Sequence, residues 1–138
     1  MKKYILYILT GFILNASATS CNKIDTIAET NLAQRMLEDK SWFLDYSEEG
    51  TINKTYIGQS TYYITFLKNL TTLDSDGLNG TYTVIKTNSQ LQIYVRAKTN
   101  NGNSIEYTYN IISIGANKLI LSYILNGKTT KLFYSSTK

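Results

Sequence analysis

Hydrophobic side chains recur at every second position over most of the chain after residue 40. Trp42, Leu44 and Tyr46 are separated by single residues, and Tyr62–Leu67 alternates in the same way. A period of two is typical of β-strands with one buried face. It predicts eight strands, one around residues 42–46 and the others over 62–67, 70–74, 80–86, 90–98, 104–112, 118–125 and 128–135.

Short turn sequences separate the expected strands. The clearest is Asn126-Gly127, a dipeptide typical of the two-residue type I′ hairpin, and Asn88-Ser89 and Asn101-Gly102 separate other pairs. Because such turns join only antiparallel neighbours, the order of strands along the chain should be their order in space. We therefore expect an up-and-down antiparallel meander.

One face of this meander collects the large apolar side chains. A meander has two free edges unless its first and last strands pair, and closure removes both. We therefore predict an all-β fold, an eight-stranded antiparallel up-and-down barrel with a short N-terminal helix. Its predicted interior consists of Trp42, Leu44, Tyr62, Ile64, Phe66, Tyr82, Val84, Leu91, Ile93, Val95, Tyr107, Tyr109, Leu119, Leu121, Tyr123, Leu132 and Tyr134.

The helix is predicted over about 27–39. Thr26 and Glu29 have the spacing of a capping box, and Ala28, Leu32 and Met36 recur every four residues. Between the first two strands, residues 47–60 contain few apolar side chains and should form a long connection. Such connections often carry contacts.

The first twenty residues have the pattern of a secretory signal. Lys2 and Lys3 precede an uncharged, largely apolar run over 4–14, and small polar residues follow up to Ser20. A helix needs roughly twenty apolar residues to span a bilayer, so this run is too short to remain as a membrane span. We expect residues 1–20 to be a cleaved signal peptide.

The single cysteine follows this segment directly. Ala18-Thr-Ser-Cys21 resembles the lipobox of bacterial lipoproteins, in which the cysteine is lipidated on sulfur and becomes the new N-terminus. The resemblance implies acyl chains on Cys21, a tether over 21–26, a barrel domain over 27–138, and a lipid-anchored protein of the bacterial cell envelope, in the outer membrane. The alternative is that Cys21 is an incidental thiol behind an ordinary cleavage site.

Composition excludes most enzyme chemistry. The 138 residues include no histidine, which removes imidazole bases, Ser-His and Cys-His nucleophile pairs and His-bearing metal sites. We predict no enzyme, no catalytic residue, no metal and no cofactor. The 14 basic and 10 acidic residues are scattered, so we expect no nucleic-acid partner. Asp74–Gly80 shares two carboxylates with a calcium loop but lacks its closing glutamate, and we interpret it as a hairpin turn.

The order of elements resembles the lipocalin-like domains of small bacterial lipoproteins. The resemblance rests on Leu37-Glu-Asp-Lys-Ser-Trp42, Tyr63-Ile-Thr-Phe66, Gly80-Thr-Tyr-Thr-Val84 and Lys118-Leu-Ile-Leu-Ser-Tyr123. In lipocalins the tryptophan of the first strand closes one end of the barrel beneath a basic side chain from the last strand. The resemblance therefore implies that Trp42 closes the barrel beneath Lys131 or Lys128. The alternative is that Trp42 is an ordinary core aromatic.

Two functions follow as hypotheses. The first is noncatalytic binding of a small hydrophobic or amphipathic ligand in the barrel mouth, lined by Tyr62, Phe66, Tyr82, Tyr107 and Tyr109. The alternative is a protein-interaction or inhibitor module that docks a partner through the 47–60 loop and surface tyrosines such as Tyr63 and Tyr94. A ligand binder should have an open apolar cavity of some hundreds of Å³, whereas an interaction module should have a filled interior.

Overall fold

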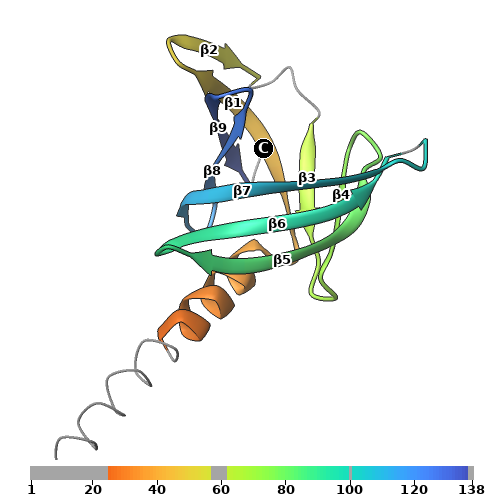
Figure 1. Cartoon of the computed structure of the whole chain (residues 1–138), viewed down its shortest axis with the longest axis vertical. Helices are drawn as coiled ribbons and strands as arrows, with labels where there is room; N and C mark the ends of the chain where they lie inside the picture. The colour runs from red at the N-terminus through yellow and green to blue at the C-terminus, as the bar shows by residue number, and fades with distance from the viewer. Residues whose placement is uncertain (1–24, 57–61, 100, 137–138) are drawn as a thin grey trace, which may run out of the picture.

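A closed antiparallel barrel of eight strands forms the body of the protein (Figure 1). The computed structural model describes residues 25–56, 62–99 and 101–136. The strands are β1 (Lys40–Glu49), β2 (Ile52–Thr55), β3 (Tyr63–Phe66), β4 (Thr71–Asp74), β5 (Asn79–Thr87), β6 (Gln90–Lys98), β7 (Ser104–Ile114), β8 (Lys118–Leu125) and β9 (Lys128–Ser135). Strands β3 to β9 follow one another in space, and β1 pairs with both β3 and β9. The predicted fold class is confirmed.

The short strand β2 is an addition that the alternation does not predict. It pairs with the second half of β1, whereas the first half of β1 pairs with β3. The expected connection over 47–60 therefore begins as an extension of β1 and a hairpin at Gly50, whose φ is +62°. Residues 57–61 of that connection lie outside the described residues.

A helix over 25–37 packs against one end of the barrel, at the bottom of Figure 1. Its buried side chains are Ala33 and Leu37, which are 2% and 0% exposed. Leu32, from the predicted apolar stripe, is 60% exposed. The helix is therefore present as predicted, but the face that it buries is a different one.

The predicted capping box is wrong, because the chain is already helical before Thr26. The Glu29 carboxylate instead meets the Lys86 ammonium of β5 at 2.6 Å, which joins the helix to the barrel wall. Within the described part of the chain, no helix has the length and apolar character needed to cross a membrane.

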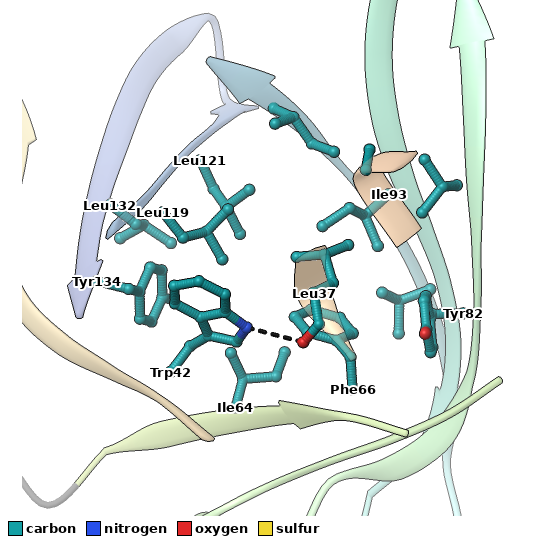
Figure 2. Close-up of a cluster of buried hydrophobic side chains, with 14 of the residues drawn as sticks. Leu37, Trp42, Ile64, Phe66, Tyr82, Ile93, Leu119, Leu121, Leu132 and Tyr134 are labelled. Atoms are coloured by element: carbon teal, nitrogen blue, oxygen red, sulfur yellow. Dashed lines mark hydrogen bonds between the residues drawn. The ribbon is translucent and has the colours of Figure 1, made fainter. Parts of the chain in front are cut away.

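The interior at the helix end is filled (Figure 2). Leu37 lies among Trp42, Ile64 and Phe66, all at most 1% exposed. The Trp42 indole Nε1–H donates to the Leu37 carbonyl at 3.0 Å. Every residue of the predicted interior is either buried in this core or packed against it, so that prediction is confirmed.

Turns and bulges set which side chains face inward. Asn126 and Gly127 have φ values of +51° and +76°, as the predicted type I′ turn requires. The register of β1 shifts between Leu44 and Tyr46, so Tyr46 points outward and stacks on Phe133 of β9 with ring centroids 4.1 Å apart. Residues of β1 beyond this bulge have exchanged inner and outer faces.

Candidate functional site

The end of the barrel opposite the helix is split into two sheets. The pairing of β1 with β3 ends at Phe43 opposite Tyr63, about halfway along β1. The pairing of β7 with β8 ends at Asn110 opposite Ser122, so the first half of β7 and the last residues of β8 diverge. One sheet has the order β8-β9-β1-β2 and the other runs from β3 to β7. We call this region the split end.

Four inward-facing tyrosines line the split end, and we call them the tyrosine cluster: Tyr62, Tyr107, Tyr109 and Tyr123. All four pack against the core without being fully buried. The rings of Tyr107 and Tyr109 meet edge to face with centroids 5.1 Å apart, and those of Tyr109 and Tyr123 do so at 5.9 Å. The rings are therefore held at steep angles to one another by mutual packing.

Two open cavities border Tyr123. The larger, of about 570 Å³, lies where β7 and β8 diverge, and it is lined by Gln92, Glu106, Tyr107, Thr108, Tyr109, Asn110, Tyr123, Ile124 and Leu125. The smaller, of about 270 Å³, lies on the β8-β9-β1-β2 sheet and is lined by Leu44, Ser47, Glu49, Ile52, Lys54, Tyr56, Tyr123, Thr130 and Leu132. The gap between β7 and β8 therefore exposes Tyr107, Tyr109 and Tyr123 to solvent from the side of the barrel.

Asp74 brings a carboxylate to the tyrosine cluster. It stands opposite Ile64 in the register of β3 and β4, so its side chain shares the inner face with Ile64. Its Oδ1 accepts from the backbone N–H groups of Asp76 and Leu78, both at 2.9 Å. Its Oδ2 accepts from the Tyr62 hydroxyl at 3.2 Å. The turn after β4 thus fixes the carboxylate on the edge of the split end.

Three phenols of the cluster, those of Tyr62, Tyr107 and Tyr109, are held in their neutral form. Burial is the main cause that raises the pKa of Tyr62, Tyr107 and Tyr109, and the negative charge of Asp74 raises the pKa of each further. For Tyr107 the pKa rises to about 12. At neutral pH these side chains therefore offer ring faces and hydroxyl groups, which suits binding.

The structure separates the five residues predicted to line one mouth. Tyr62, Tyr107 and Tyr109 lie together at the split end, whereas Phe66 and Tyr82 lie at the helix end. Phe66 and Tyr82 are 0% and 1% exposed, and their rings meet edge to face at 4.9 Å inside the filled core (Figure 2). The Tyr82 hydroxyl donates to a carbonyl there. These two residues therefore do not line an open mouth.

Trp42 is fully buried at the helix end, but the predicted contact with the last strand is wrong. The Lys40 ammonium, from β1 itself, lies 5.0 Å from the centre of the Trp42 ring. Lys131 points outward from β9, with its ammonium 3.9 Å from the Glu48 carboxylate. Lys128 begins β9 at the split end, the far end of the barrel. Lys131 is on the outer face because it lies between the buried residues Thr130 and Leu132 of β9.

A second group of aromatic side chains lies on the outside of the barrel. Phe43 and Tyr63 face each other across β1 and β3 with ring centroids 5.6 Å apart, next to the stacked pair of Tyr46 and Phe133. We call these four residues the outer aromatic patch. Tyr94, the other tyrosine predicted for a surface platform, lies away from this patch on β6.

The predicted signal peptide and the lipidation site at Cys21 lie outside the described residues. In comparisons with known proteins, no family model, no curated protein and no solved structure matches the chain.

Proposed function

We propose that the protein binds a small hydrophobic or amphipathic ligand, without catalysis, at the tyrosine cluster of the split end. The observation that carries this proposal is the cavity of about 570 Å³ between β7 and β8, which has Tyr107, Tyr109 and Tyr123 in its walls. Small-molecule sites have volumes of roughly 300–1,000 Å³ and are mostly apolar with a few polar groups. The size and the lining of this cavity both fit that class.

The two ends of the barrel have complementary roles in such a site. The filled core at the helix end holds the strands together, and the tyrosines at the split end supply apolar faces that a ligand can cover. The hydroxyl groups and the Asp74 carboxylate supply the polar contacts that would orient the ligand. A well-packed core next to an opening lined by packed aromatic rings favours selective binding over nonspecific adsorption.

Binding can be tested with N-phenyl-1-naphthylamine, an uncharged apolar dye that fluoresces more strongly in apolar surroundings. We expect a saturable increase with one dye per protein. Tyr123→Ala should weaken it about tenfold, because Tyr123 lines both cavities. Tyr63→Ala, on the outer face of β3 and outside both cavities, is the matched control and should bind as the wild type does. Absence of saturable binding, or equal loss in both variants, would overturn the proposed site.

We also propose that the chain is a lipid-anchored protein of the bacterial outer membrane, related to lipocalin-like lipoproteins. The signal-like residues 1–20, the small residues before Cys21 and the up-and-down barrel support this proposal. Mass spectrometry of the protein purified from its native membrane should show an N-terminus at Cys21 that carries acyl chains. Cys21→Ser should remove the modification and release the protein from the membrane fraction. An unmodified Cys21 in the native protein would contradict the anchor.

The outer aromatic patch favours a second candidate function, an interaction module that docks a protein partner. Its four half-buried rings include Tyr46, which pairs with Thr55 in the described part of the 47–60 segment, and this segment is predicted to carry contacts. A photo-crosslinking amino acid placed at Tyr63 should then give one discrete adduct in cells, and the same amino acid at Tyr94 should give none. Equal labelling at both positions would argue against a docking surface at the patch.

A further inference from the structure

We propose that the ligand of the split end is a cationic amphiphile, in which an amine or quaternary ammonium group carries an apolar body. This inference rests on the proposed binding function and names the class of ligand. Its basis is one carboxylate, Asp74, which lies on the inner face of β4 and accepts a hydrogen bond from Tyr62 of the tyrosine cluster.

The charge of Asp74 has no cationic partner among the described residues. Its oxygens accept hydrogen bonds from two backbone N–H groups and one phenol, all of which are neutral donors. The described ion pairs all involve other carboxylates, which belong to Glu29, Asp39, Glu48, Glu49 and Glu106. None of these donors carries a positive charge that would balance the carboxylate.

The negative charge of Asp74 lies close enough to the tyrosine cluster to affect its phenols. The Tyr62 hydroxyl donates to the carboxylate at 3.2 Å, and the negative charge also raises the pKa of Tyr107 and Tyr109. A cation bound against these rings would also lie within reach of Asp74, whereas an anion there would be repelled. The carboxylate therefore makes the electrostatic potential at the tyrosine cluster negative.

The aromatic rings of the cluster also favour a positively charged ligand. The planes of Tyr107 and Tyr109 make an angle of 75°, and those of Tyr109 and Tyr123 an angle of 76°. An exposed aromatic face attracts an ammonium group because it carries the negative part of the ring quadrupole, whereas a face covered by the edge of a neighbouring ring does not. The neutral phenols are electron-rich rings of this kind.

The wall of the larger cavity agrees with this assignment. The described residues that line it include Glu106 and no lysine or arginine. Over the whole chain, basic residues exceed acidic ones by 14 to 10. Glu106 is paired with Arg96 at 2.7 Å, so the wall of this cavity adds no net positive charge that would repel a cation. The basic residue of the smaller cavity, Lys54, shares that cavity with Glu49.

Three surfactants with the same eight-carbon tail isolate the effect of the head group: octyltrimethylammonium, octyl glucoside and octyl sulfate. Their affinities for the purified protein can be measured by isothermal titration calorimetry below their critical micelle concentrations. We expect octyltrimethylammonium to bind at least about tenfold more tightly than octyl sulfate, with octyl glucoside between them. This preference should shrink at high ionic strength.

Asp74→Asn is the most direct variant, because an asparagine oxygen can still accept the two backbone hydrogen bonds. It should weaken octyltrimethylammonium binding about tenfold and leave octyl glucoside binding unchanged. Asp76→Asn removes the same charge from an exposed position of the same turn and should keep the wild-type preference.

The outcomes separate the two proposals. Equal affinity of the wild-type protein for the three head groups, or a preference for octyl sulfate, would overturn the cationic ligand and leave a binding site in place. Absence of binding by all three surfactants and by the neutral dye would overturn the binding function itself. The head-group comparison uses the wild-type protein, so it tests the proposal of a cationic ligand even if Asp74→Asn does not fold.

Discussion

The indole N–H of Trp42 donates a hydrogen bond to the backbone carbonyl of Leu37 at 3.0 Å inside the buried core (Figure 2). Leu37 is the last residue of the helix, and the last carbonyls of a helix have no partner within it. This contact therefore completes the helix end and attaches it to β1. It makes the helix part of the barrel's core.

Replacing the donor should destabilise the fold. Trp42→Phe keeps an aromatic ring in the core but leaves the Leu37 carbonyl buried without this partner. We expect the free energy of unfolding to fall by about 1–3 kcal/mol. Urea denaturation followed by circular dichroism measures the change, and a loss below about 0.5 kcal/mol would show that the bond contributes little to stability.

The helix offers a matched pair of leucines that tests which face it buries. Leu37→Ala removes a fully buried side chain and should cost about 2–5 kcal/mol. Leu32→Ala changes a side chain that is 60% exposed and should alter stability by less than about 0.5 kcal/mol. The same denaturation assay compares the two variants. Comparable losses for both would place the helix differently against the barrel.

Gly80 marks a close approach between β5 and β6. A Cβ atom at this position would meet the carbonyl oxygen of Arg96 and lie 2.5 Å from the Cα of Ala97. Backbone atoms cannot give way as a flexible side chain does, so Gly80→Ala should cost about 1–3 kcal/mol or more. Gly115→Ala is the control, because the atom nearest to such a Cβ, the Lys118 carbonyl oxygen, is 3.8 Å away. A tolerated Gly80→Ala would contradict the described register.

Stability at alkaline pH should report on the tyrosine cluster. The pKa of Tyr107 rises from 10.0 to about 12 in the folded protein, mainly through burial. A group whose pKa is higher when folded stabilises the fold while it is protonated. This contribution is complete below about pH 10 and disappears as the pH rises towards 12.

Tyr107→Phe removes that titration. In urea denaturation between pH 10 and 12, its free energy of unfolding should fall less steeply than that of the wild type, with the difference set by this one group. Parallel curves for the two proteins would mean that Tyr107 is solvated as in the unfolded chain.

Much of the fold could be predicted because its signals are local. Alternation along each strand identified the inward residues, and the Asn126-Gly127 turn fixed a hairpin and its register. Strand β2 gave no such signal, because Ile52 is its only apolar residue and all four of its side chains are exposed. The buried helix face also could not be predicted, because it depends on how the helix meets the barrel.

The site was predicted only in part for a similar reason. Alternation shows that Tyr62 and Tyr82 face inward, but it does not show at which end of the barrel each one lies. That position depends on strand register, and on bulges such as the one between Leu44 and Tyr46. Asp74 was interpreted as a turn residue, although its spacing from Thr72 in β4 places it on the inner face.

Tyrosine-selective NMR gives the most direct test of binding at the split end. With ring-¹³C tyrosine in the protein and assignments from single Tyr→Phe variants, N-phenyl-1-naphthylamine should shift the signals of Tyr107, Tyr109 and Tyr123 along one saturation curve. The signals of Tyr46 and Tyr63, which lie outside both cavities, should stay in place. Saturable shifts confined to Tyr46 and Tyr63 of the outer aromatic patch, or no saturable shift at all, would contradict a ligand site at the tyrosine cluster.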